Sequence, residues 1–168
     1  LCGGYTGDKD GILAALLVTE MAAYYKEQGE SLVDKLNFLN LEYGYYYNET
    51  QDLVFDGIVG KKKMQSFMTK LHDEPLEKLG DKKSAVLADY LECSENNLQT
   101  GRLTKINLPP NDMVKYIFTD GCSLVVRPSG TEPKLKIYYN TAAESFSDAE
   151  KNAAAMKNNM IAILSQYI

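Results

Sequence analysis

The chain has 168 residues, of which 45% are hydrophobic and 24% are charged, and its formal net charge is −5. This composition is typical of a globular protein of about one domain and excludes global disorder. No run of about 18 apolar residues is present to cross a membrane, no basic and apolar leader indicates secretion, and the negative charge argues against a dedicated nucleic-acid binder.

Two helices and two short strands are predicted in the first third of the chain. Apolar residues from Leu13 to Tyr24 recur at helical spacing, and Gly29 follows them where a helix C′ glycine belongs. Ser31 is predicted to cap the next helix, because Asp34 stands three residues on and favours the positive end of the dipole. These patterns predict helices over 9–28 and 32–43 and short strands over 45–47 and 53–55.

The charge distribution indicates a boundary after these elements. Residues 1–55 carry 3 Lys and Arg against 9 Asp and Glu, whereas residues 56–168 carry 15 against 14. Residues 56–60 read Asp-Gly-Ile-Val-Gly. Two glycines that flank two apolar residues are typical of a hinge. We therefore expect one unit over 1–56 and a second over 57–168.

The second unit is predicted to begin and end with a helix. Apolar residues from Met64 to Leu71 predict a helix that ends before Pro75. The final helix is assigned a capping box over 147–150. Its apolar stripe comprises Ala149, Ala153, Met156, Met160, Ile163 and Tyr167.

Antiparallel strands are predicted between these helices. Asp120-Gly121 predicts the tight turn of a β-hairpin, and apolar residues alternate with polar ones along 134–139, as in a strand with one wet face. The predicted strands cover 85–93, 103–107, 114–118, 123–126 and 134–139. The fold class is therefore α+β, with an antiparallel sheet packed against helices in two layers.

The spacing of the cysteines and the single histidine do not indicate a metal site. The three cysteines, Cys2, Cys93 and Cys122, are an odd number without CxxC spacing, so we expect neither a disulfide framework nor a zinc site and predict a cytoplasmic location. His72 is the only histidine, and we expect it on the surface of a helix. The sequence thus predicts no metal site in this chain.

The loop 127–133 joins two predicted strands and combines the groups that bind an oxyanion. The planar guanidinium of Arg127 can donate two parallel hydrogen bonds to phosphate. Gly130 lets the backbone turn so that successive N–H groups face one anion. Only two arginines, Arg102 and Arg127, occur in the chain. On spacing alone, an ordinary connecting loop is the alternative. The candidate phosphate-binding residues are Arg127, Ser129, Gly130, Thr131 and Lys134.

A second candidate site lies at the start of the first predicted helix. Residues 6–11 read Thr-Gly-Asp-Lys-Asp-Gly, and a helix N-terminus presents free N–H groups and the positive end of the dipole. Lys9 is the candidate catalytic residue there, as a cation for phosphate or as a proton donor. The alternative, which the sequence alone favours, is N-capping by Asp8 with Lys9 in solvent.

Both candidate sites resemble parts of the α-D-phosphohexomutases, the family of phosphoglucomutases and phosphomannomutases. Arg-Pro-Ser-Gly-Thr-Glu-Pro-Lys at 127–134, followed by an alternating strand and a terminal helix, is similar to that family's phosphate-binding loop. Gly-Gly-Tyr-Thr-Gly-Asp-Lys-Asp-Gly-Ile at 3–12 resembles the segment after the sugar-recognition loop of its third domain. The resemblance covers essentially the whole chain, and the form of the loop is more similar to the bacterial glucose-preferring branch.

The resemblance implies that the chain is part of a larger enzyme, an intramolecular phosphotransferase. Members of the family carry a phosphorylated serine, an Asp-rich Mg²⁺ loop, a Glu-containing sugar loop and a phosphate grip on four successive domains. Residues 1–56 would be the C-terminal part of the third, α/β domain, a helical or α/β remnant. Residues 57–168 would be the TBP-like fourth domain, which grips the phosphate that is not transferred.

The implied cofactors and partners follow from the same resemblance. Mg²⁺ and glucose 1,6-bisphosphate are implied for the complete enzyme, with no cofactor in this part. The partners would be a phosphosugar and the missing N-terminal domains, without nucleic acid or membrane. One departure matters: many relatives have a basic residue where Gly7 stands here, which weakens any claim that two cations act at this helix start.

Two other classes of protein compete with this interpretation. The first is a non-enzymatic α+β module that binds a protein or a nucleic acid, and nucleic-acid binding would need a basic stripe on its strands. A small kinase-like nucleotide binder would need a phosphate loop between a strand and a helix, which is absent. The three lysines at 61–63 are expected on a solvated helix face. Lysines available for a basic stripe are Lys105, Lys115, Lys134 and Lys136.

Overall fold

The computed structural model describes residue 4 and residues 7–166. The chain divides into two compact units, Leu1–Gly44 and Tyr45–Ile168. Of the residues named in the sequence predictions, those outside the described part of the chain are Cys2, Gly3, Tyr5, Thr6 and Tyr167.

The N-terminal unit contains the two helices that the sequence predicted. α1 (Gly11–Glu27) and α2 (Leu32–Tyr43) are separated by Gly29, whose φ of 75° is the left-handed conformation that ends many helices. Ser31 caps α2 in a capping box with Asp34, as expected. No described residue of either helix is buried, so the described part of this unit has no core of its own.

The C-terminal unit combines an antiparallel sheet with two helices, α3 (Gly57–Asp73) and α4 (Phe146–Leu164). The strands are β1 (Tyr45–Val54), β2 (Lys78–Leu79), β3 (Lys82–Asp89), β4 (Ser94–Asn97), β5 (Leu103–Lys105), β6 (Val114–Phe118), β7 (Ser123–Pro128) and β8 (Lys134–Ala143). Their order across the sheet is β1-β8-β7-β6-β3-β4-β5, and β2 pairs with β3 at the side.

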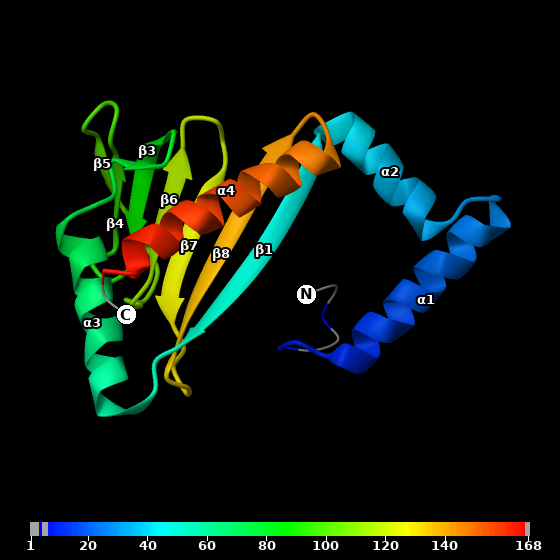
Figure 1. Ribbon diagram of the computed structural model, residues 1–168. Helices are drawn as coiled ribbons and strands as arrows, with labels where there is room; N and C mark the ends of the chain where they lie inside the picture. Colours follow the sequence, from blue (N-terminus) through cyan, green and yellow to red (C-terminus); the bar gives the residue numbers. More distant parts are fainter. Residues whose placement is uncertain (1–3, 5–6, 167–168) are drawn as a thin grey trace. The chain divides into compact units, whose positions relative to one another are not determined.

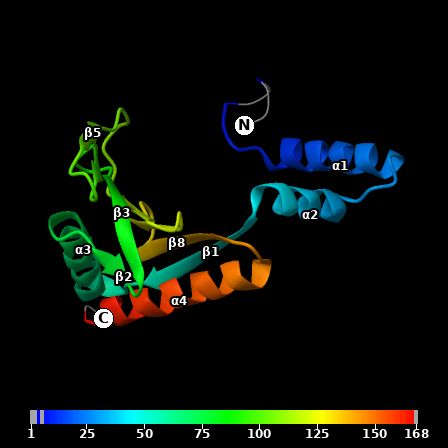
Figure 2. The same ribbon diagram turned by 90° about the horizontal axis from the view of Figure 1, so that it is seen from above.

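Both helices pack on one face of this sheet (Figures 1 and 2). Every second side chain of β6 and β8 is buried on that face, which confirms the predicted alternation and the two-layer α+β fold. The opposite face carries half-buried side chains such as Arg127 and Tyr138, and no described helix of this unit covers it. Helix residues buried in the core are Met64, Phe67, Met68, Leu71, Ala149, Ala153, Met156, Met160 and Leu164.

The predicted strands 45–47 and 53–55 are a single strand, and this moves the boundary between the units. β1 pairs with β8 without interruption, from Tyr45 opposite Ala143 to Val54 opposite Lys134. The sequence did not predict one continuous strand, because the residues in the middle of β1 are polar. In the structure these positions alternate between half-buried and exposed, as the rest of β1 does. The compact units therefore divide at Gly44, rather than near position 56, since β1 belongs to the sheet.

Two predicted helix starts are wrong. Residues 57–60 are the first turn of α3 rather than a hinge. Gly60 is needed there for close packing, because a Cβ on it would lie 2.6 Å from the carbonyl carbon of Phe55. α4 begins two residues earlier than the predicted capping box, because the side chain of Ser145 accepts the Asp148 N–H at 3.1 Å and makes Ser145 the N-cap.

The sheet also differs from the predicted strands around the turn after β3. The predicted strand 85–93 ends at Asp89, because its Oδ1 accepts the N–H groups of Leu91 at 2.9 Å and Glu92 at 3.1 Å and bends the chain. β4 was not predicted, since its residues, Ser-Glu-Asn-Asn, show no apolar alternation. The hairpin of β6 and β7 is confirmed.

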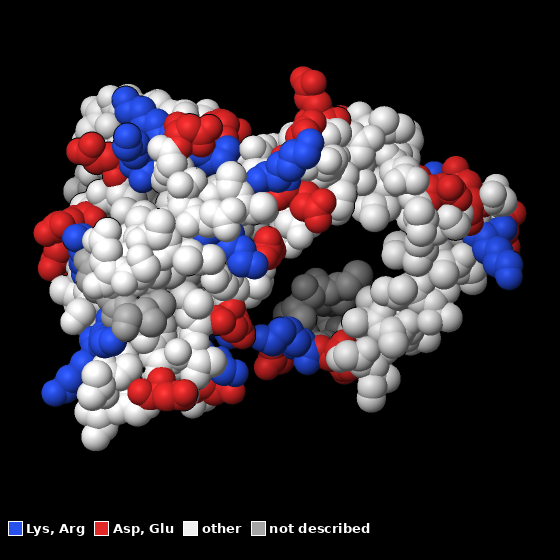
Figure 3. Space-filling view, in the orientation of Figure 1, with Lys and Arg blue, Asp and Glu red and all other residues white. Residues whose placement is uncertain are grey.

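Charges of both signs are interspersed over the C-terminal unit, on the left of Figure 3. That view shows the side on which α4 covers the sheet. A lysine on the strands is also paired with a carboxylate, since Lys136 Nζ lies 3.3 Å from Asp52 Oδ2. This pairing disfavours a nucleic-acid-binding sheet, which would need unpaired cations in a row.

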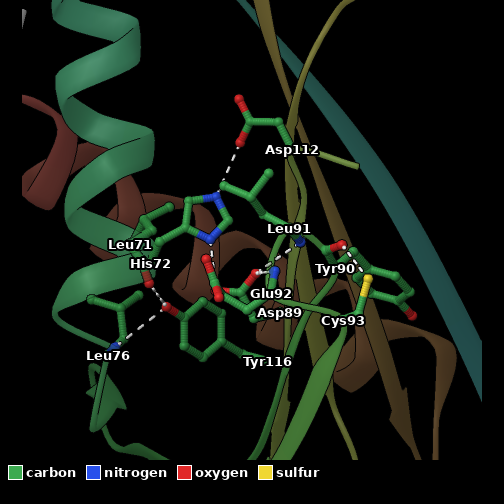
Figure 4. A network of polar contacts seen from close by, with 10 residues as sticks. All are labelled: Leu71, His72, Leu76, Asp89, Tyr90, Leu91, Glu92, Cys93, Asp112 and Tyr116. Carbon is green, nitrogen blue, oxygen red and sulfur yellow. Dashed lines mark hydrogen bonds and ion pairs between the residues drawn. The ribbon is translucent and has the colours of Figure 1, made fainter. Parts of the chain in front are cut away.

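His72 lies between two carboxylates rather than on the surface (Figure 4). Its Nδ1 is 2.7 Å from Asp89 Oδ2 and its Nε2 is 3.0 Å from Asp112 Oδ1, and only 9% of the side chain is exposed. The expectation of a surface histidine is wrong because both partners come from segments far along the chain. Beside this cluster, the Tyr116 hydroxyl donates to the Leu71 carbonyl at 3.1 Å. Together these contacts join α3 to β3 through Asp89, to the segment before β6 through Asp112, and to β6 through Tyr116.

The two carboxylates change the proton affinity of His72. Burial by itself lowers the pKa of His72, but the hydrogen bonds to Asp112 and Asp89 and their negative charges outweigh burial, so the pKa is raised above its ordinary value of 6.5. Each ring nitrogen of His72 faces a carboxylate oxygen. An imidazole can donate a hydrogen bond from both nitrogens only when it is protonated. Protonation of His72 therefore stabilises this junction.

Limited proteolysis tests the boundary between the units. We expect early cleavage within residues 28–44, because the helices there bury no described residue, and a resistant fragment that begins near Tyr45. N-terminal sequencing and mass spectrometry of the fragment check this. Early cleavage within 56–60, with loss of β1 from the resistant fragment, would contradict the observed fold.

The His72 cluster predicts a pH dependence of stability. Since the folded state binds the proton more tightly, the stabilisation from His72 is fully present below pH about 6.5 and is lost as the pH rises through the raised pKa. Urea unfolding of the chain and of His72→Gln between pH 5.5 and 9 should show a difference in the free energy of unfolding that shrinks with rising pH. A difference that is constant or grows over this range would refute the assignment.

Candidate functional site

The predicted phosphate loop lies between β7 and β8, and its backbone is closed by two short hydrogen bonds. The Ser129 N–H donates to the Lys134 carbonyl at 2.8 Å, and the Lys134 N–H donates to the Glu132 carbonyl at 2.7 Å. Within the described part of the chain, the N–H groups of Gly130 and Thr131 donate to no protein acceptor. Successive backbone N–H groups of this kind can share one oxyanion.

A cavity of about 260 Å³ opens beside this loop. Three of the predicted site residues, Ser129, Gly130 and Thr131, line it together. The remaining lining residues are Lys61, Met64, Glu132 and Pro133. The structure thus brings Ser129, Gly130 and Thr131 to one concave surface and adds two residues of α3 to its lining.

Lys61 is the residue of this site that sequence reasoning missed. The sequence pattern places it on a solvated helix face together with the two lysines that follow it. Nothing in the local sequence connects α3 with a loop that lies between β7 and β8. The connection depends on the fold, because α3 begins directly after β1, and β1 pairs with β8, which starts at the end of the loop.

Arg127 belongs to the same hairpin but not to the lining of the cavity. It is a half-buried residue of β7 that pairs with Lys136. Since Val126 is buried in the core, alternation along the strand puts Arg127 on the uncovered face of the sheet. Its Nε is buried without a hydrogen-bond partner among the described residues, and a buried, unpaired guanidinium nitrogen is costly unless an acceptor binds it.

Lys134 is partly neutralised by its neighbour. Its Nζ lies 3.3 Å from Glu132 Oε1, and its side chain is half-buried. The same pair balances the carboxylate that Glu132 brings to the cavity. The role of Lys134 in phosphate binding stays a prediction, and its charge is shared with Glu132.

The second candidate site, at the start of α1, lies in the N-terminal unit. Asp10 rather than Asp8 is the N-cap, and its Oδ1 accepts the N–H groups of Ile12 at 2.8 Å and Leu13 at 3.0 Å. Asp10 thereby occupies two of the groups that an anionic ligand would use. Lys9 is exposed in the segment before the helix.

The described residues contain neither a metal cluster nor a membrane span. No group of three or more His, Cys, Asp or Glu among them could hold a metal ion. Among the same residues, no helix combines the length and the apolar character that crossing a bilayer requires. Cys93 and Cys122 are free thiols, and the cytoplasmic location stays a prediction.

A larger cavity, of about 480 Å³, lies near the start of β3 and contains none of the predicted site residues. It is lined by Pro75, Leu76, Glu77, Lys83, Ser84 and Leu98. Its one lysine and one glutamate offset each other, and its serine hydroxyl donates to the Leu76 carbonyl at 2.6 Å. The loop between β7 and β8 is therefore the better candidate for an anionic ligand.

The comparisons with known proteins bear on the same part of the chain. A family model described as "Phosphoglucomutase/phosphomannomutase, C-terminal domain" matches residues 70–158, which include this loop. The phosphoglucomutase of Staphylococcus aureus strain MSSA476 is 30% identical over 152 residues, and that of strain N315 is 28% identical over the same length. Each match covers 90% of this chain but only 27% of the relative.

A solved structure supports the fold. The crystal structure of parafusin from Paramecium, titled as a phosphoglucomutase in its open form, matches 97% of this chain and 28% of its own chain, with a TM-score of 0.52 and 18% identity. At this identity the likeness concerns the fold alone. The family model, in contrast, matches more than half of the residues of this chain. The chain therefore belongs to the phosphoglucomutase/phosphomannomutase family and carries its C-terminal domain.

Proposed function

We propose that this chain is the C-terminal part of a phosphohexomutase, of the phosphoglucomutase type, which interconverts hexose 1-phosphate and hexose 6-phosphate through a bisphosphate intermediate. The observation that carries the proposal is the loop between β7 and β8, where two hydroxyls and unpaired N–H groups line one cavity in a member of this family. The chain spans 27% of the length of its curated relatives, so the complete reaction needs further segments.

The loop would hold the phosphate that is not being transferred. Ser129 and Thr131 offer hydroxyl donors, and Gly130 leaves the backbone N–H groups accessible to an oxyanion. Arg127, whose Nε has no protein partner among the described residues, would donate to phosphate oxygens from the neighbouring strand. Holding one phosphate positions the sugar for transfer at its other end, and phosphoryl transfer depends on such positioning and on charge neutralisation.

The remaining chemistry would lie on the N-terminal domains of the complete enzyme. There a phosphoserine would donate the phosphoryl group, Mg²⁺ would be bound, and glucose 1,6-bisphosphate would form and turn over. The described residues of this chain do not fit a metal, so the ligands of Mg²⁺ are assigned to those other domains. Lys9 would act as an electrostatic or acid–base helper near the reacting group, although the Asp10 cap reduces the capacity of that helix start for an anion.

The alternative of a non-enzymatic binding module is less well supported. The pairing of Lys136 with Asp52 removes one of the cations that nucleic acid would need on the sheet. No specific observation favours a protein partner for the sheet over the missing domains of the same enzyme.

Replacement of Arg127 tests the phosphate grip. A charge-assisted hydrogen bond contributes about 1.5–3 kcal/mol, so Arg127→Ala should weaken the binding of inorganic phosphate about ten- to a hundredfold. Arg127→Lys should have a smaller effect, because it keeps the charge but loses the fork. Phosphate titrations followed by amide NMR check this, with shifts expected at Ser129, Gly130 and Thr131.

The other arginine provides the matched control for this experiment. Arg102 is exposed and lies outside the cavity, so Arg102→Ala should bind phosphate like the unchanged chain. If the unchanged chain shows no shifts in the loop at high phosphate, or if both alanine variants weaken binding equally, the grip is refuted.

The chain alone is expected to have no mutase activity. The proposed phosphoryl carrier and metal ligands are assigned to other domains, so glucose 1-phosphate with glucose 1,6-bisphosphate and Mg²⁺ should not be converted above background. Addition of the separately produced N-terminal domains should restore measurable turnover. Metal-dependent turnover by the purified chain would contradict the proposal of an incomplete enzyme.

A further inference from the structure

Lys61 is the residue that the start of α3 contributes, with Met64, to the cavity beside the phosphate loop. It is exposed, lies in the first turns of α3 and lines the cavity together with Ser129, Gly130 and Thr131. We infer that Lys61 is a phosphate-binding residue of this site and supplies the positive charge inside the cavity. The inference rests on the proposed phosphate-binding function of the loop and assigns a further residue to it.

The backbone around Lys61 holds the start of α3 against the loop. The Phe55 N–H, just before the helix, donates to the Pro133 carbonyl at the end of the loop at 2.8 Å. Gly60 packs so closely on Phe55 that no side chain fits between them. The position of Lys61 relative to the loop is therefore set by main-chain contacts, and only its own side chain is adjustable.

The charge balance of the cavity also points to Lys61. Lys61 is the only cation among the residues that line the cavity, and among the described residues its ammonium group makes no ion pair or hydrogen bond. Glu132 contributes the one carboxylate, which Lys134 offsets at 3.3 Å. Without Lys61 the cavity would have no net positive charge, whereas a phosphate monoester carries about −1.5 to −2 at pH 7.

This assignment gives the loop two cations on different sides. Arg127 stands on the uncovered face of the sheet and outside the cavity lining, while Lys61 stands on the helix-covered side. An oxyanion that sits in the cavity itself depends on Lys61. An oxyanion that sits only above the uncovered face does not, so the two positions can be told apart by experiment.

The test compares two neighbouring lysines. In the 168-residue chain, Lys61→Met should weaken the binding of inorganic phosphate about tenfold, as expected for one lost charge-assisted contact, and Lys61→Arg should recover most of the affinity. Lys62→Met removes the same charge from the next position, outside the cavity lining, and should change the affinity less than about twofold. Methionine favours helix and retains an apolar stem, so both variants should fold.

Amide shifts of Gly130 and Thr131 give the affinity at constant ionic strength, and the Cε resonances of ¹³C-labelled lysine give a direct readout. Lys61 Cε should shift with phosphate at the same midpoint as the loop amides, and Lys62 Cε should not. Loop shifts with an unchanged affinity in Lys61→Met would overturn this inference and leave the proposed function intact. An absence of loop shifts in the unchanged chain would overturn both.

Discussion

The pairing of β1 with β8 is the interaction on which the C-terminal unit depends. It joins residues 45–54 to residues 134–143 in one uninterrupted antiparallel register, so the first strand of the unit lies beside the last. The end of β1 thereby lies next to the start of β8, where the Phe55 N–H binds the Pro133 carbonyl. Because α3 follows β1 directly, the same pairing brings the start of this helix to the phosphate loop.

The candidate site is accordingly a product of two layers. The hairpin of β7 and β8 supplies hydroxyls and N–H groups, and the helix layer supplies Lys61. A loop alone would offer its donors from one side and leave the anion in solvent. A cavity lined by both the loop and the helix offers donors and a cation from two elements of the fold.

The His72 cluster plays a comparable role at another junction of the unit. Asp89 and Asp112 hold the imidazole from β3 and from the segment before β6, and neither group is close to His72 in the sequence. Asp89 is buried while Asp112 is partly exposed, and a buried carboxylate is costly without a cation beside it. The proton on His72 therefore belongs to the stability of the fold, which separates this cluster from the chemistry proposed for the loop.

Sequence by itself determined the features whose groups are neighbours along the chain. These are the capping of α2 by Ser31, the apolar stripe of α3, the hairpin turn, and the grouping of Ser129, Gly130 and Thr131 on one loop. Periodicity and turn chemistry act over a few residues, so these could be predicted. Only the tertiary structure decided that β1 is one strand, that Gly60 is packed in a helix rather than free in a hinge, and that Lys61 lies beside the loop. These features depend on strand register and side-chain burial between distant segments, about which local sequence patterns carry no information.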